Sequence, residues 1–531
     1  MSCLTGAGPK HMDPQFWRIV MAEMTRKSFL RLAAAAATSA AFGSQASAQS
    51  PSVMAPRLSG STSPLLISGA DVLTMDPALQ EIEGGDVLVE NGKISAVGKG
   101  LALDGAEVID ARGMILMPGM CDGHRHVWQI IDAGRLAKTR PAHYATYQNW
   151  KMRIIVSLTP ADHYLSGLVG GLLAIDSGVT SIIDYAHGQI NAENALAAGQ
   201  GVKDSGIGGW FAFQLGVSSS YKPGDTVPIA VATSQRIAKT TETHWATAER
   251  LQKEVFSDSS GAMQLGLAPA AGNGSSLEEI KTEWTRIRGM GVSLLAAHLH
   301  KPEHPAAKGF MGHRDSGIPD LNEAGLLGPD YHASHANRLT AEELSMLRDT
   351  GGMVCATTMG EFPYVVAAHR GPSVHARARA AGVATGIGID VNLVLTQDYF
   401  EHIRAAFWSH YLEPAGMELA EKYKSEDTFD FATALGARSL RLGDVAGSIT
   451  VGKRADLVLL NTNRIGFALQ GSLADRVVNF ASREDVDSVW IGGEARKRHG
   501  EMIGIDWAIL KSQVEAAQTR FGPEAASITF T

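Results

Sequence analysis

Short apolar runs separated by polar turns recur near both ends of the chain. Near the N-terminus, Asn91-Gly92 lies between two runs of alternating apolar and polar residues. This arrangement is a strong signal for a β-hairpin. A similar signature returns in Gly447–Leu460 and Val486–Gly493. The two ends together predict one small composite β-sandwich domain, built from residues 64–113 and 439–500.

The long middle of the chain, residues 114–438, alternates strand-like apolar runs with helical stretches. Eight candidate strands follow one another in this part of the sequence. They are Ile115–Cys121, Val179–Asp184, Gly209–Phe213, Met263–Leu267, Ser293–His298, Tyr331–His335, Met353–Thr357 and Ala384–Ile389. Eight strands with intervening helices predict an α/β fold, a (β/α)8 TIM barrel, in which reactive groups gather at the C-terminal ends of the strands.

The composition fits a globular chain with a large core. The chain has 531 residues, of which 45% are apolar, and a formal net charge of −8. It has no basic stripe, so we expect neither nucleic acid nor a membrane surface among its partners. A small-molecule substrate is the expected partner, and a homo-oligomer is left open. In the C-terminal part, residues 501–531, Trp507–Phe521 is expected to form an amphipathic helix that covers the sandwich or meets a second subunit.

Residues 1–48 are predicted to be an N-terminal extension and signal peptide. Basic residues in Met24–Leu32 precede an alanine-rich apolar run, and Ala46-Ser47-Ala48 offers a small-residue cleavage site. The segment Arg26–Leu30 is similar to a twin-arginine signal whose second arginine has become lysine. We therefore expect export to the bacterial periplasm or secretion, with a retained N-terminal helix as the alternative.

Polar side chains that an apolar core would not select follow five of the eight candidate strands. The first strand ends in His124-Arg125-His126, where alternate residues point the same way and two imidazoles can bind one ion. Asp184 and His187 follow the second strand. The fifth, sixth and eighth strands end at His298, His335 and Asp390. Since a barrel brings these ends to one mouth, we expect them to form a common site.

Three imidazoles and one carboxylate form a ligand set suited to Zn²⁺, Fe²⁺ or Mn²⁺. A coordination position left open for water would make such a site catalytic, because the ion lowers the pKa of that water. Asp390 is the candidate for moving the proton to the leaving group. His187 is a candidate to lie against the substrate, and an equally weighted alternative is that it stabilises its own loop.

The chain resembles the amidohydrolase superfamily from about residue 64 to residue 500. The motifs that carry this resemblance are Met117–His126, Gly178–Asp184, His298, Ser334–Leu344, Gly386–Asp390 and Val445–Leu457. Within the superfamily, the chain is similar to the mononuclear branch of triazine chlorohydrolases and cytosine- and guanine-deaminase-like enzymes. The resemblance implies one divalent metal ion, with Zn²⁺ preferred, bound by His124, His126, His298 and Asp390. It also implies that His335 orients the water or polarises the substrate.

One departure from the branch affects the expected reaction. Its deaminases carry His-x-x-Glu on strand five, whereas His298 is followed by Leu299-His300-Lys301. Glu303 and Glu361 are the alternative proton donors, and neither has a spacing that compels the assignment. Four aromatic residues are candidates to line the substrate pocket, although packing is the commoner role for such residues. They are Trp128, Tyr185, Phe362 and Tyr364.

We therefore expect a metal-dependent hydrolase that cleaves a carbon–nitrogen bond of a small molecule with metal-activated water. The expected substrate is an amide, a cyclic amide or a related carbonyl derivative. Hydrolytic deamination or dechlorination of a nitrogen heterocycle is the first alternative. A non-catalytic periplasmic binding protein on the same barrel is the second alternative.

Overall fold

A computed structural model of the chain describes residues 63–136, 144–235, 238–271, 275–299, 317–361, 373–412, 421–467 and 470–531. Several residues singled out in the sequence lie outside these ranges. They are the signal segment in residues 1–48, His300, Glu303, Phe362 and Tyr364.

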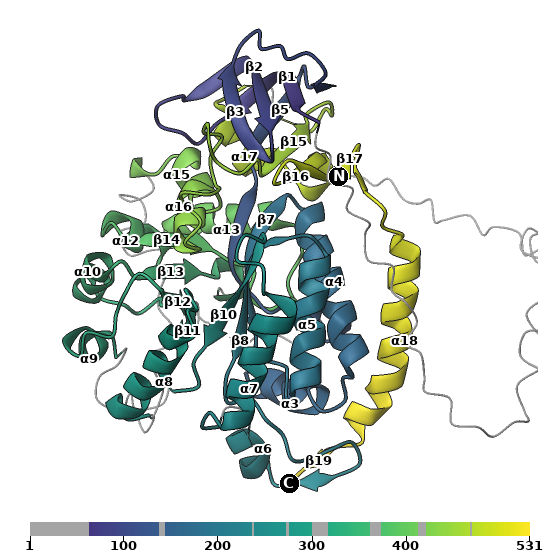
Figure 1. Ribbon diagram of the computed structural model, residues 1–531, viewed down its shortest axis with the longest axis vertical. Coiled ribbons are helices and arrows are strands. Elements are labelled where there is room, and N and C mark those ends of the chain that lie inside the picture. The colour runs from purple at the N-terminus through teal and green to yellow at the C-terminus, as the bar shows by residue number, and fades with distance from the viewer. Residues whose placement is uncertain are drawn as a thin grey trace, which may run out of the picture. The chain divides into compact units, whose positions relative to one another are not determined.

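Eight parallel strands form a barrel, which confirms the predicted fold class (Figure 1). In sheet order they are β6 (Met120–Arg125), β7 (Val179–Ala186), β8 (Gly208–Gln214), β10 (Met263–Ala268), β11 (Leu295–Leu299), β12 (Tyr331–His335), β13 (Met353–Ala356) and β14 (Ala384–Ile387). A parallel bridge between Arg125 and Asp390 joins the end of the first strand to the residues after the last. This bridge closes the ring of strands.

Helices alternate with the barrel strands. They are η1 (Val127–Asp132), α3 (Tyr144–Ile154), α4 (Pro160–Asp176), α5 (Ala192–Asp204), α6 (Ile229–Gln235), α7 (Glu242–Arg250), η2 (Leu251–Val255), α8 (Leu277–Gly289), α9 (Ile318–Glu323), α10 (Ala341–Thr350), α12 (His375–Ala380), α13 (Tyr399–Ser409), η3 (His410–Leu412), α15 (Ser425–Asp430) and α16 (Ala434–Ser439). Several begin with a capping box, in which a Ser or Thr side chain and an acidic side chain three residues later each accept from the other's backbone N–H. Thr159 with Asp162 starts α4 in this way, and Thr340 with Glu343 starts α10.

The first predicted strand, Ile115–Cys121, is two strands in the structure. β5 (Met114–Pro118) belongs to the second sheet of the protein, and β6 of the barrel starts at Met120. Gly119 separates the two strands, and a Cβ atom at this position would lie 2.2 Å from Oγ1 of Thr180. The structure therefore places residues 114–118 in the β domain rather than in the predicted barrel range. The boundary between β5 and β6 could not be predicted, because both strands are mostly buried and form one continuous apolar run in the sequence.

The second sheet has nine strands and is built from both ends of the described chain. Its strands are β1 (Leu65–Leu73), β2 (Glu81–Glu90), β3 (Lys93–Gly98), β4 (Glu107–Asp110), β5, β15 (Leu457–Asn461), β16 (Val486–Ile491), β17 (Glu494–Arg498) and β18 (Glu501–Met502). Asn91 and Gly92 both have positive φ angles, as a two-residue hairpin turn between β2 and β3 requires. The sheet folds over a core that includes Ile67, Leu116 and Trp490.

The remaining elements are η4 (Arg483–Asp485), α17 (Leu473–Phe480), α18 (Trp507–Ala526) and the short paired strands β9 (Thr226–Val227) and β19 (Thr529–Phe530). The C-terminal helix α18 packs against η1, α3 and α4 of the barrel. The side-chain amide of Gln518 donates to the carbonyl oxygen of Ile131 at 2.8 Å. Arg520 forms an ion pair with Asp162 at the start of α4. The helix therefore supports the barrel, and the expectation that it covers the sandwich is corrected.

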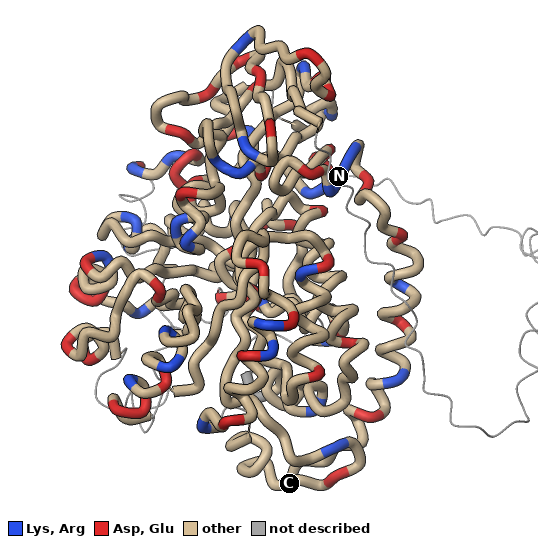
Figure 2. The backbone as a smooth tube through the Cα atoms, in the orientation of Figure 1, with Lys and Arg blue, Asp and Glu red and all other residues tan. Residues whose placement is uncertain are grey.

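Charged side chains are spread along the described chain. Figure 2 shows Lys and Arg interspersed with Asp and Glu over both the barrel and the β domain. Within the described ranges, no helix combines the length and the apolar character that a bilayer crossing requires.

Replacement of Gly388 by alanine tests the closure of the barrel. A Cβ atom at residue 388 would lie 2.6 Å from the carbonyl oxygen of His124 and 2.7 Å from its amide nitrogen. Because both atoms belong to the backbone of β6, we expect Gly388→Ala to cost about 2 kcal/mol or more of unfolding free energy in urea. Gly289→Ala is the control, because its Cβ atom would meet no other atom within 4 Å. Equal stability of the two variants would contradict this account of the closure.

Candidate active site

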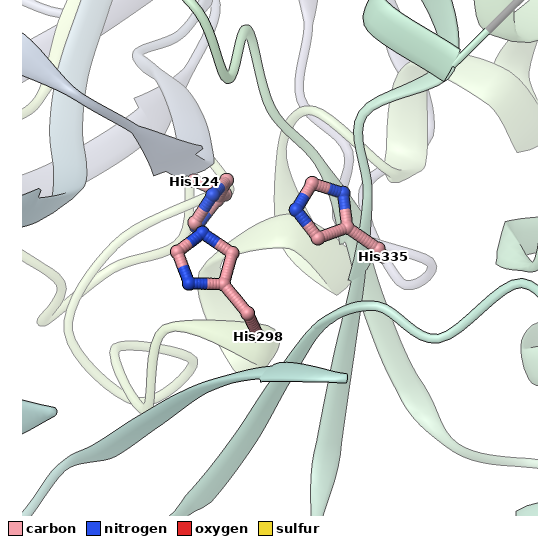
Figure 3. Close-up of side chains that lie close together, drawn as sticks. All are labelled: His124, His298 and His335. Carbon is pink, nitrogen blue, oxygen red and sulfur yellow. The ribbon is translucent and has the colours of Figure 1, made fainter. Parts of the chain in front are cut away.

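The polar side chains selected from the sequence converge at one end of the barrel. His124 and His126 come from the end of β6, His298 from β11 and His335 from the last residue of β12. Asp390 lies three residues after β14. His298 is half-buried, and the other four residues are buried. Figure 3 shows the rings of His124, His298 and His335 facing one another across a small space.

Two overlapping groups of these side chains have the spacing of a metal site. The ring nitrogens of His124, His298 and His335 include one set of atoms that all lie within 4.8 Å of one another. The same holds for His124, His126 and Asp390. The structure thus brings together all four predicted metal ligands and the predicted partner His335.

Two of these residues adopt backbone conformations that L-amino acids rarely occupy. The φ angle is +70° at Asp390 and +73° at His335. At Asp390 the surrounding backbone holds this conformation: the Asp390 N–H donates to the His124 carbonyl at 2.8 Å, and the His126 N–H donates to the Asp390 carbonyl at 3.0 Å. Such strained conformations cluster at functional sites, where the rest of the structure enforces them.

The protonation of His126 is set by its backbone neighbour. Its Nδ1 atom lies 2.9 Å from the carbonyl oxygen of Tyr185, which can only accept a hydrogen bond, so Nδ1 carries the proton. Burial lowers the pKa of His126, which favours the neutral ring. In that ring the lone pair of Nε2 faces Oδ1 of Asp390 at 3.2 Å. Two electron-rich atoms at this separation fit a cation between them.

His124 presents its ring in a similar way. Its Nδ1 atom lies 2.8 Å from the hydroxyl oxygen of Ser334. Its Nε2 atom is buried, lies 3.6 Å from Oδ1 of Asp390, and has no hydrogen-bond partner within the described part of the chain. Imidazole nitrogens and a carboxylate that converge in this way fit a divalent metal ion.

His335 is held from the side opposite the cluster. Its Nδ1 atom lies 2.9 Å from Oε1 of Glu361 and 3.0 Å from the hydroxyl oxygen of Thr357. Figure 3 shows its Nε2 atom turned toward His124 and His298. Glu361, one of the two alternative proton donors, thus lies against His335.

His187 lies beside His126, with the two rings parallel and their centroids 3.9 Å apart. The indole N–H of Trp128 donates to Nδ1 of His187 at 2.8 Å, so the proton of the neutral ring is on Nε2. Nε2 lies 3.4 Å from the hydroxyl of Tyr147. Burial lowers the pKa of His187 well below its usual range. This geometry supports a role in packing His126, and the catalytic role of His187 stays a prediction.

Asp184, at the end of the second predicted strand, contacts the backbone next to the cluster. Its Oδ1 atom accepts a hydrogen bond from the N–H of Val127 at 3.0 Å. Burial raises the pKa of Asp184 to about 7. Asp184 therefore supports the chain that follows His126.

Trp128, one of the candidate pocket residues, is buried in packing contacts with Trp150 and His187.

Three partners of the histidines were not singled out in the sequence. They are Ser334, Thr357 and the backbone carbonyl of Tyr185. Ser334 precedes His335, and neighbouring residues of a regular strand point to opposite faces. Both contact the cluster because His335 leaves the regular strand conformation. The sequence offered one signal for Ser334 as a partner: it is a hydroxyl residue directly before His335 at the end of a candidate strand.

One family model matches most of the chain. The profile of the amidohydrolase family matches residues 115–496. The chain is 25% identical to the 5'-deoxyadenosine deaminase of Methanothermobacter thermautotrophicus, over 85% of this chain and 97% of that protein. It is 26% identical to the hydroxydechloroatrazine ethylaminohydrolase of Pseudomonas sp. (strain ADP), over 82% of this chain and 91% of that protein.

A solved structure shares the fold. The atrazine chlorohydrolase of Arthrobacter aurescens TC1, complexed with zinc, superposes with a TM-score of 0.71 and 18% sequence identity. The superposition covers 85% of this chain and 99% of that protein. It supports the barrel with an attached β domain as one architecture.

Replacement of Ser334 by alanine tests the support of His124. Loss of the hydroxyl removes the partner of Nδ1 and leaves the ring less firmly oriented, so we expect metal affinity to fall about 10- to 100-fold. Competition with a chromogenic chelator measures this affinity. Ser166→Ala is the control, because the Ser166 hydroxyl is also buried but bonds to the carbonyl of Asp162 within α4. Unchanged affinity in Ser334→Ala would show that the hydroxyl does not orient the ring.

Proposed function

Because the chain belongs to the amidohydrolase family, we propose that the histidine and aspartate cluster at the barrel mouth is its active site. The chain is a hydrolase that acts on a carbon–nitrogen bond of a small molecule. One observation carries the assignment of the site: the buried Nε2 atom of His124 faces Asp390 without a hydrogen-bond partner within the described residues. An ion or an ordered water molecule satisfies a buried polar atom in that position.

The proposed ligands are His124, His126, His298 and Asp390, which would hold one divalent metal ion. Zinc is the preferred ion, because the ligands are imidazole nitrogens and a carboxylate, and because the related atrazine chlorohydrolase structure is a zinc complex. Fe²⁺ and Mn²⁺ remain the alternatives. The ion would lower the pKa of a coordinated water molecule and so supply the nucleophile.

Two side chains would carry out proton transfer and orientation of the water. Asp390 lies at the mouth, where its carboxylate would accept a proton from the attacking water and pass it to the leaving nitrogen. Of the two roles expected for His335, orientation of the water fits better. A ring with its proton on Nδ1 offers Nε2 as an acceptor for a water O–H, whereas polarisation of a carbonyl needs a donor.

An amide or cyclic amide is the leading substrate class. Its carbonyl carbon accepts a nucleophile without protonation of an aromatic ring, so the reaction does not need the strand-five glutamate that this chain lacks. The second candidate is a nitrogen heterocycle with an exocyclic amino or alkylamino group. The names of the two curated relatives favour it, since one is a deaminase and the other an ethylaminohydrolase.

Metal removal and substrate screening test the proposed function. We expect protein purified without chelator to hold about one equivalent of metal by elemental mass spectrometry, and to release amine or ammonia from an amide, cyclic amide or aminoheterocycle. Dialysis against 1,10-phenanthroline should abolish turnover, and added Zn²⁺ should restore it.

Two test variants and one control complete that experiment. His124→Ala and Asp390→Asn should each lose most of the metal and all turnover, whereas His163→Gln, a buried histidine on α4 outside the cluster, should keep both. A metal-loaded protein without turnover on the whole panel would favour the non-catalytic binding protein. Turnover that survives in Asp390→Asn would refute the proposed proton transfer.

We also propose export of the chain, on the basis of its first 48 residues alone. After expression of the full chain in a bacterium with a periplasm, we expect mature protein that begins at Gln49, detected by N-terminal sequencing of the periplasmic fraction. A paired Arg26→Gln and Lys27→Gln variant should stay unprocessed in the cytoplasm. Unprocessed wild-type protein in the cytoplasm would contradict export.

A further inference from the structure

We propose that Glu361 is a positioning residue, which fixes the ring of His335 so that Nε2 faces the proposed metal ligands as an acceptor. This inference rests on the proposed function, because it concerns a residue of the same site. Oε1 of Glu361 lies 2.9 Å from Nδ1 of His335. It acts from behind His335, through the ring nitrogen that faces away from the cluster in Figure 3.

The hydrogen bonds around Glu361 define the proton on His335. Oε1 of Glu361 accepts from the backbone N–H of Thr357 at 3.3 Å and from its hydroxyl at 2.9 Å. Nδ1 of His335 lies 2.9 Å from the same oxygen. The Thr357 hydroxyl has given its proton to Glu361, so it too can only accept from Nδ1. Both neighbours of Nδ1 are acceptors, and Nδ1 must therefore carry the proton.

The local chain explains how Glu361 reaches this position. Thr357 directly follows β13, and the Glu361 N–H donates to the Thr357 carbonyl at 3.1 Å in a single helical turn. Residues four apart on a helical turn lie on the same side, which brings the carboxylate back over Thr357. Glu361 is 1% exposed, so the contact with His335 is shielded from water. A buried charge-assisted hydrogen bond of this kind orients an imidazole firmly.

The consequence for the site is a choice between two tautomers. With Glu361 in place, the neutral ring of His335 directs the Nε2 lone pair toward His124 and His298. With a carboxamide at residue 361, the amide N–H can donate to Nδ1, and the proton then moves to Nε2. A ring in that tautomer can no longer accept a hydrogen bond from the attacking water. A carboxylate that holds the tautomer of a catalytic histidine contributes strongly to turnover in the serine-protease triad.

Steady-state kinetics of Glu361→Gln, His335→Asn and the double variant test the proposal, with the best substrate of the amide and aminoheterocycle panel. We expect Glu361→Gln to lower kcat by at least about 10-fold, and to change KM by less than about 3-fold. Bound metal and melting temperature should stay close to those of the wild type. Because Glu361 acts through His335, the double variant should be no slower than His335→Asn alone.

A matched control uses another buried carboxylate. Glu343 caps the start of α10, where it accepts from the backbone N–H of Thr340. Glu343→Gln should keep kcat at the wild-type value. If Glu361→Gln also keeps the wild-type kcat, or if the losses of the two single variants multiply in the double variant, the proposal is wrong.

A second measurement does not depend on turnover. In metal-free and zinc-loaded protein labelled with ¹⁵N-histidine, the NMR signals of His335, assigned with His335→Asn, report which ring nitrogen carries the proton. We expect Nδ1–H in the wild type and its loss in Glu361→Gln. An Nε2–H tautomer in the wild type would overturn the proposal. If the wild type hydrolyses nothing on the panel, the proposed function fails, and this measurement alone decides the role of Glu361.

Discussion

Two backbone hydrogen bonds hold the rest of the site in place. They run from the Asp390 N–H to the His124 carbonyl and from the His126 N–H to the Asp390 carbonyl. They join the first and last strands of the barrel at the point where three proposed ligands emerge. The same contact closes the ring of strands and sets the spacing of the side chains, so barrel closure and site geometry are one constraint. Gly388 permits this approach because it has no Cβ atom between the strands.

Around this contact, the surroundings of three imidazoles decide which nitrogen faces the centre. A backbone carbonyl holds His126, a serine hydroxyl contacts His124, and a carboxylate holds His335. In each ring the outer nitrogen is bound to the protein and Nε2 is left for the site. Burial then disfavours the charged form of His126. The partners behind the rings therefore determine the chemistry as much as the rings do.

Much of this architecture could be predicted from the sequence, because its strongest signals are local. Each of the eight predicted strands overlaps one barrel strand, although most of the first lies in β5 of the other sheet, and the Asn91-Gly92 hairpin lies where its dipeptide indicates. The boundary between β5 and β6 was not predicted, since both strands are apolar and only Gly119 lies between them. The partners Ser334 and Glu361 depend on the left-handed turn at His335 and on the helical turn after β13, which periodicity does not reveal. The docking of α18 on the barrel is a long-range contact with no local signature.

The nine-stranded sheet has a consequence for the order in which the chain folds. β5 lies next to β15, yet the ribosome makes the whole barrel between these two strands. The edge of β5 that pairs with β15 therefore stays unpaired while the ribosome makes the barrel. An exposed edge of this kind is a template for mispairing with another chain. Completion of the β domain is thus a late event in biosynthesis.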